Sequence, residues 1–225
     1  MGPQSRYRRL SDLPEKIPVF PLHGSILLPR AKLPLNVFEP RYLEMLDYVM
    51  SGQRMIGIIQ PQATDIEEES PQEATALKSV GCAGRVTAYQ ELDDGRLVIS
   101  LFGIARFRSR FEENTSHPFR ILSVDYAEFA HDLSAGSGED DVDREHLLEV
   151  LRAYLDAKDL EADWNAVNNA ATELLVNSLS TISPFGPEEK QALLEARTLK
   201  ERAEVLSTLA TMELATDDRS GGGVQ

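Results

Sequence analysis

The feature that most constrains the fold is a change in hydrophobic period near residue 130. Before it, apolar runs such as residues 17–20 and 55–59 are short and bounded by proline or glycine, a pattern typical of β-strands. After it, apolar residues recur every three to four positions, as on one face of a helix. The chain is therefore predicted to be α+β, with a β-rich N-terminal region followed by a bundle of about four helices.

The clearest β element is a hairpin over residues 85–91 and 96–102. Its turn contains Gly95, which can adopt the positive φ that a tight turn needs. Successive side chains of a strand point to opposite faces. The strand that continues from the hairpin is therefore expected to be half-buried, with one face carrying Phe107, Ser109 and Phe111 and the other carrying Arg106, Arg108 and Arg110.

One short helix is predicted inside the β region. It begins at Pro40, whose fixed φ suits a first helical turn, and ends near Ser51. Its buried face would carry Leu43, Leu46 and Met50.

Four helices are predicted after residue 142. Residues 143–156 and 164–179 carry apolar stripes at helical spacing. Pro187 opens a third helix with acidic residues in its first turn, where the helix dipole favours them. Thr198 and Glu201 form a capping box for the fourth.

Composition suggests where the domains begin and end. We expect a flexible tail over residues 1–12, a β domain over 13–130, an acidic Gly/Ser linker over 131–142, a helical subdomain over 143–215 and a disordered tail over 216–225. Residues 64–78 are acidic and without period, which is typical of a mobile loop.

Charge and cysteine content exclude several classes of function. The net charge of −14 opposes contacts with phosphate, so we expect no nucleic acid as a partner. Cys82 stands alone in an apolar run and is predicted to be a small buried residue. The four histidines are scattered, so neither a metal site nor a cofactor is expected. Because no signal peptide or membrane span is seen, we expect a cytoplasmic protein.

Motifs for nucleotide binding and for nucleophilic catalysis are absent from the sequence. There is no P-loop, no G-x-G-x-x-G turn and no G-x-S-x-G elbow. His23, near Ser25, is predicted to be a hydrogen-bonded turn histidine in preference to a catalytic base. An anion or RNA face is the alternative for the arginines, but a solvated strand face balanced by acids is preferred for residues 106, 108 and 110, with Arg85 and Arg120 nearby.

A set of motifs resembles the substrate-binding N-terminal domain family of the ATP-dependent protease Lon, in particular its free-standing bacterial branch. The clearest is Val37-Phe38-Glu39-Pro40-Arg41-Tyr42, close to the family's I-F-E-P-R-Y form. The resemblance covers residues from about 15 to 212. Its further pieces are residues 17–22, 28–29, 33–36, 43–45, 81–84, 103–107, 176–179 and 189–195.

The resemblance implies a PUA-like pseudo-barrel followed by helices, and recognition of unfolded or flexible polypeptide segments. In Lon, separate ATPase and Ser-Lys protease modules do the chemistry, so this chain is expected to be a non-catalytic module whose link to an ATP-dependent protease would act in trans. An apolar groove or an exposed strand edge would bind the polypeptide. The candidate residues are Phe38, Glu39, Arg41, Tyr42, Arg106 and Phe107.

Two further readings stay open at this point. PUA-like barrels also occur in RNA-modifying proteins, and a cleft between barrel and helices could hold a small-molecule enzyme site. The motif around residue 38 also has a structural reading. Leu35, Val37 and Phe38 would point into the barrel, and Glu39 would hydrogen-bond to Arg41.

Overall fold

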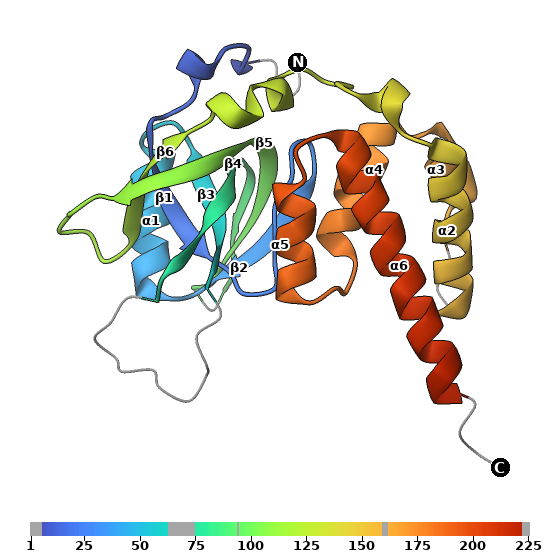
Figure 1. Cartoon of the computed structure of the whole chain (residues 1–225). Helices are drawn as coiled ribbons and strands as arrows, with labels where there is room; N and C mark the ends of the chain where they lie inside the picture. Colours follow the sequence, from blue (N-terminus) through green and yellow to red (C-terminus); the bar gives the residue numbers. More distant parts are fainter. Residues whose placement is uncertain (1–5, 63–74, 94, 159–161, 222–225) are drawn as a thin grey trace.

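The computed structural model describes residues 6–62, 75–93, 95–158 and 162–221, with side chains to residue 215. Most of the predicted loop over residues 64–78 and the outermost residues of both predicted tails lie outside these ranges. The predicted α+β class is confirmed: a mixed sheet with one short helix precedes a region of helices (Figure 1).

Six strands form the N-terminal half, and five of them close into a barrel. Around the ring the order is β5, β4, β3, β1 and β6, and β6 pairs again with β5; β2 is an extra strand on the outer edge of β5. Among the strand pairings that the structure describes, only that of β1 with β3 is parallel. The strands are β1 (Lys16–Pro21), β2 (Lys32–Val37), β3 (Met55–Pro61), β4 (Leu77–Glu91), β5 (Leu97–Glu112) and β6 (Arg120–Asp125).

The predicted hairpin is the pairing of β4 with β5. Gly95 in its turn has φ of +79°, as expected for the tight connection. Farther along, a close approach occurs at Gly103, because a Cβ there would lie 1.9 Å from the carbonyl oxygen of Leu28. The segment before β2 therefore rests directly on the backbone of β5.

Helix α1 (Pro40–Met50) lies against one side of the barrel and starts at Pro40, as predicted. Its buried side chains are Tyr42, Met45, Leu46 and Val49. The predicted buried face was displaced by part of a helical turn. Leu43 and Met50, predicted to be buried, are only partly buried at the margin of the observed face.

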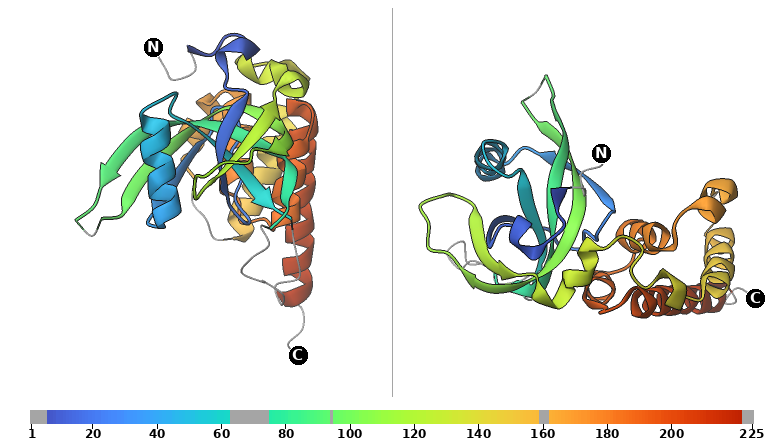
Figure 2. Two further views of the ribbon diagram at one scale, coloured as in Figure 1. Left: turned by 90° about the vertical axis from the view of Figure 1, so that its left-hand side faces the viewer. Right: turned by 90° about the horizontal axis from the view of Figure 1, so that it is seen from above.

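The second half of the chain is helical and stands beside the barrel (Figure 2). The predicted single helix over residues 164–179 was wrong. It is two helices, because Ala170 and Ala171 have extended φ/ψ, and Asp163 caps the first of them through bonds from two backbone N–H groups. The helices are α2 (Arg144–Ala157), α3 (Trp164–Asn169), α4 (Thr172–Ile182), α5 (Pro187–Glu195) and α6 (Leu199–Gly221).

The predicted capping box at α6 forms only in part. The Thr198 hydroxyl accepts a hydrogen bond from the N–H of Glu201 at 3.1 Å. The carboxylate of Glu201 accepts from the N–H of Arg197, one residue before the expected donor. The cap still satisfies two N–H groups at the start of the helix.

The segments expected to be tails or linker carry ordered contacts. Tyr7 is buried, and its hydroxyl accepts a hydrogen bond from Arg85. Residues 131–142 hold the end of one 3-10 helix, η3 (Ala127–Leu133), and a second, η4 (Glu139–Asp141). Helical backbone continues through residues 216–221.

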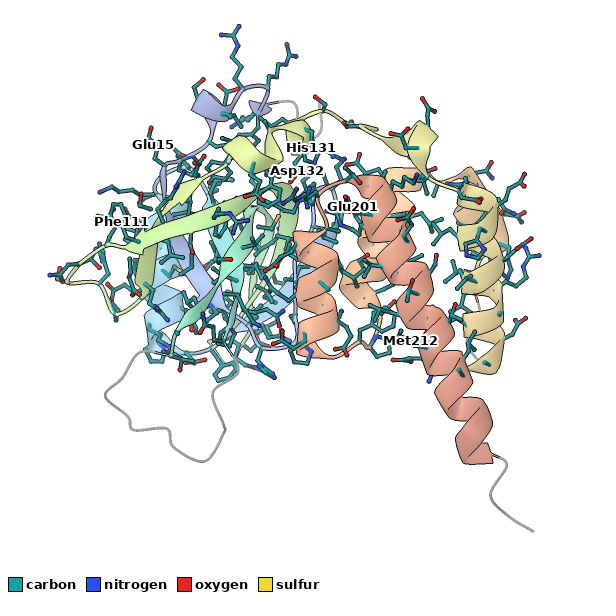
Figure 3. The ribbon with its side chains drawn as sticks, viewed as in Figure 1. Glu15, Phe111, His131, Asp132, Glu201 and Met212 are labelled. Atoms are coloured by element: carbon teal, nitrogen blue, oxygen red, sulfur yellow. The ribbon has the colours of Figure 1, made fainter. Side chains whose placement is uncertain are left out.

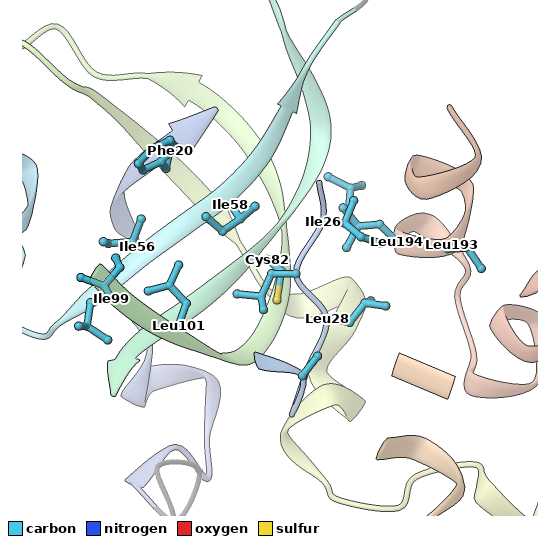
Figure 4. Close-up of a cluster of buried hydrophobic side chains, with 14 of the residues drawn as sticks. Phe20, Ile26, Leu28, Ile56, Ile58, Cys82, Ile99, Leu101, Leu193 and Leu194 are labelled. Carbon is cyan, nitrogen blue, oxygen red and sulfur yellow. The ribbon is translucent and has the colours of Figure 1, made fainter. Parts of the chain in front are cut away.

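One hydrophobic core extends from the barrel interior into the helices. Residues 26–28, between β1 and β2, lie between the two halves and are fully buried. In Figure 4, Ile26 and Leu28 separate the barrel side chains Cys82 and Leu101 from Leu194 of α5. This shared core fixes the helices to the barrel. Among the described residues, no helix is long and apolar enough to cross a membrane.

Candidate functional site

Phe38 is the most exposed aromatic side chain of the motif over residues 37–42. It is 64% exposed, whereas Val37, the last residue of β2, is 1% exposed. The prediction that both side chains enter the barrel was wrong for Phe38. Neighbouring residues leaving a strand point to opposite sides, so a buried Val37 directs Phe38 outward.

The residues after Phe38 form a fixed corner at the start of α1. Glu39 accepts a hydrogen bond from Arg41 Nε at 3.0 Å, which confirms the predicted contact, and Arg41 Nη2 lies 2.8 Å from the same carboxylate oxygen. The Arg41 guanidinium lies 4.6 Å from the ring centroid of Tyr42, and Tyr42 stacks on Phe20 with centroids 3.9 Å apart. Burial raises the pKa of the Tyr42 hydroxyl. Tyr42 therefore anchors the corner, and Phe38 is the side chain it presents to solvent.

A second aromatic group lies toward the other end of α1. Tyr48, 46% exposed, contacts the ring of His117 edge-on with centroids 5.0 Å apart, and His117 stacks on buried Phe119 at 4.7 Å. The His117 ring nitrogen Nδ1 lies 3.6 Å from the Glu44 carboxylate. We call the exposed surface made by Phe38, Glu39, Arg41, Glu44, Tyr48 and His117 the α1 face.

The open edge of β2 is poorly suited to accept an added strand. Among the residues that the structure describes, β2 pairs only with β5. The N–H of Gly103 donates to the carbonyl of Ala31, so Ala31 and every second residue after it direct their backbone polar groups toward β5. Pro34, opposite Ser100, lies between two such residues, and its nitrogen therefore faces the open side. Proline has no N–H to donate there, so the α1 face is the better candidate for polypeptide binding.

The arginines of β5 and β6 do not form a free basic face. Each exposed arginine lies beside a carboxylate, which neutralises its charge. The pairs are Arg108 with Glu128 at 2.6 Å, Arg110 with Asp125, and Arg120 with Glu112 at 2.5 Å.

Arg106 was predicted on the solvated face, and that was wrong. It is 1% exposed because η3 and α5 cover β5 at this point. Its Nε and Nη2 donate to Asp132 at 2.9 and 2.8 Å, and its Nη1 donates to the carbonyls of Leu194 and Ala196. Figure 3 shows Asp132 and His131 at this junction. Phe107 points the other way and is fully buried beside Tyr126, so neither candidate side chain is exposed to a polypeptide.

The charges at this junction are buried structural pairs. Burial alone would raise the pKa of Asp132, but the hydrogen bonds and charge of Arg106 together hold that pKa below its ordinary value. Burial and the nearby Arg106 charge lower the pKa of Arg202, which donates to Asn177 at 2.7 Å. Asn177 in turn donates to the carbonyl of Pro29. The boundary between barrel and helices is thus filled by side chains, which opposes an enzyme site there.

Two other candidate groups are placed without catalytic geometry. His23 is exposed in a turn, and no hydrogen bond joins its ring to the described residues, so the expected turn hydrogen bond was wrong and no pair with Ser25 forms. Cys82 is fully buried, as predicted, and burial raises the pKa of its thiol. Within the described ranges, no three His, Cys, Asp or Glu residues gather as metal ligands would.

The motif corner and the barrel-plus-helices architecture agree with a known family. Residues 16–211 match the ATP-dependent protease La (LON) substrate-binding domain. The chain belongs to this family. The Lon match covers the barrel, α2 to α5 and the first half of α6, including the α1 face and the Arg106 junction.

Curated relatives are full Lon proteases that extend well beyond the matched part. The Lon protease of Flavobacterium johnsoniae is 24% identical over 206 residues, which is 90% of this chain and 24% of that protein. The Lon protease of Anaeromyxobacter dehalogenans is 27% identical over 218 residues, covering 93% and 24%. The chain thus spans about a quarter of these relatives, and the match is to their substrate-binding domain alone.

Solved structures share the Lon N-domain fold. A Lon N-terminal domain protein from Xanthomonas campestris has a TM-score of 0.61 at 22% identity, covering 86% of this chain and 97% of that one. The N-terminal domain of the Mycobacterium avium complex Lon protease has a TM-score of 0.63 at 16% identity, covering 87% and 98%.

Sequence reasoning found the α1 corner but missed its second half. Phe38, Glu39, Arg41 and Tyr42 lie together, as the motif suggested, whereas Arg106 and Phe107 lie elsewhere and are buried. His117 and Tyr48 gave no signal, because a lone histidine in a loop and an aromatic residue in a helix are both common in sequences.

Proposed function

We propose that this Lon-type domain is a non-catalytic module that binds unfolded or flexible polypeptide segments through the α1 face. The observation that carries the proposal is Phe38, a large apolar side chain held outward on a rigid corner of a substrate-binding domain. Because contacts of Tyr42 and of Glu39 with Arg41 hold the corner, its backbone loses little entropy when it binds. Glu39 and Arg41 at the corner add polar groups for the polypeptide backbone.

We further propose that the module works in the cytoplasm and delivers its polypeptide in trans to an ATP-dependent protease. The family match supports this role, since residues 16–211 match the substrate-binding domain of an ATP-dependent protease. The paired arginines and the net charge of −14 speak against RNA as the ligand.

Replacing Phe38 by serine is expected to weaken binding of a fluorescein-labelled, unstructured peptide rich in leucine and phenylalanine by about tenfold, because the contact of one large aromatic ring is lost. Fluorescence anisotropy titration of the purified chain measures the change. Stability should stay within about 0.5 kcal/mol of wild type, since Phe38 is exposed.

The matched control is Phe111→Ser. The exposed fraction of Phe111, 61%, is similar to the 64% of Phe38. Phe111 lies near the end of β5 and outside the motif corner. Binding by this variant should stay within about twofold of wild type. Equal losses from both variants would show that Phe38 has no special role and would remove the α1 face from the proposal.

A further inference from the structure

The helical half carries an open pocket on the side of α6 that bears Met212 (Figure 3). Its volume is about 390 Å³. The walls come from the end of α2, the turn between α4 and α5, the first turn of α5 and the second half of α6. We call it the helical pocket, and its lining is Lys158, Phe185, Gly186, Glu189, Leu209, Met212 and Glu213.

The floor of the helical pocket is apolar and continues inward. Phe185 also lines a narrow crevice between α2, α4 and α6, whose walls include Leu151 and Leu206. Met212 is 61% exposed beside the opening. A methionine side chain adapts to differently shaped apolar ligands because it is unbranched and polarizable. The floor therefore suits a large apolar side chain from a ligand.

The rim of the helical pocket is acidic. Lys158 Nζ lies 3.3 Å from Glu213 Oε2, so its positive charge is already shared with that carboxylate. The carboxylate of exposed Glu189 makes no ion pair with the described residues. The Glu189 carboxylate is thus available to pair with a cation of a ligand. The net charge of −14 also favours a cationic ligand.

We propose that the helical pocket is a second polypeptide-binding site, which takes segments with a large apolar side chain next to a lysine or arginine. The apolar side chain contacts Phe185, Leu209 and Met212, and the cation pairs with Glu189. This site is separate from the α1 face, so each of the two can fail without the other.

Two labelled peptides test the proposal by anisotropy with the full chain: one in which leucines and phenylalanines alternate with lysines, and the same peptide with glutamates for lysines. The lysine peptide is expected to bind with micromolar Kd and the glutamate peptide about tenfold more weakly. Glu189→Lys should reduce that preference by about fivefold or more. An unchanged preference would contradict the pairing with Glu189.

Variants at exposed apolar residues locate the lysine peptide. Met212→Ser should weaken its binding about fivefold, whereas Leu174→Ser, at an exposed leucine of α4 that does not line the pocket, should stay within about twofold. Phe38→Ser should weaken binding of the lysine peptide less than Met212→Ser does, because only the helical pocket offers the Glu189 carboxylate to its lysines. Loss with Phe38→Ser but not with Met212→Ser would place the peptide on the α1 face alone and overturn the second site. Circular dichroism melts confirm that each variant is folded.

Discussion

Asp132→Asn is expected to lower the free energy of unfolding by about 3 to 5 kcal/mol. The substitution keeps the size of the side chain but leaves the Arg106 guanidinium buried without its counterion, and breaking a buried ion pair from one side costs this much. Asp132 accepts three hydrogen bonds from Arg106, one of them from its backbone N–H. Urea unfolding followed by circular dichroism measures the change.

Glu128→Gln is the matched control for that experiment. It removes the carboxylate that pairs with Arg108, which lies on the same strand as Arg106. The side chains of Glu128 and Arg108 are both more than a third exposed. Surface pairs of this kind contribute at most about 1 kcal/mol. If both substitutions cost the same, the junction between barrel and helices is not held by the Arg106 pair.

The same pair gives a pH dependence with a definite sign. The pKa of Asp132 is lowered in the folded protein, so its contribution to stability is present above its unfolded value of 3.8. That contribution is lost as the pH falls through the folded pKa. Below pH 4, the difference in stability between wild type and Asp132→Asn should therefore shrink. A constant difference down to the acid transition would contradict the pairing.

Gly103→Ala is expected to destabilise the fold by about 3 kcal/mol or more, because the added methyl group would meet the Leu28 carbonyl oxygen at 1.9 Å. Backbone cannot give way as a flexible side chain can, so residues 26–28 would have to move off β5. These residues bridge the barrel and the helices, and the damage should therefore reach both halves. Thermal melting shows the loss.

Gly52→Ala tests the same chemical change where there is room. Its added methyl group would meet only the carbonyl oxygens of Val49 and Tyr48, at 3.8 and 3.9 Å. We expect a change within about 0.5 kcal/mol. A Gly103 variant as stable as the Gly52 variant would mean that residues 26–28 do not rest on β5 as described.

The sequence predicted the β-to-α order, the hairpin and the helix at Pro40 because each depends on local pattern or on one residue's φ preference. The burial of Arg106 could not be predicted in this way. Alternation assigns a residue to one face of a strand, but it does not show which parts of that face a distant helix covers. Asp132 and the α5 carbonyls that pair with Arg106 lie 26 to 90 residues farther along the chain.

Two local errors have equally physical causes. Phe38 was placed in the barrel together with Leu35 and Val37, yet the alternation that buries Val37 turns Phe38 outward. The helical stripe over residues 164–179 continues across Ala170 and Ala171, which have no side chain beyond Cβ to signal the break. Alanine favours helix, so only the tertiary packing of α3 and α4 shows the interruption.

The most direct test of polypeptide recognition compares one labelled polypeptide in an unfolded and a native form, titrated with the purified chain at about 50 and 300 mM salt. We predict saturable binding of the unfolded form with micromolar Kd, little binding of the native form, and less than a threefold change with salt, since apolar contacts dominate. Equal binding of both forms, or no binding of either, would contradict the account.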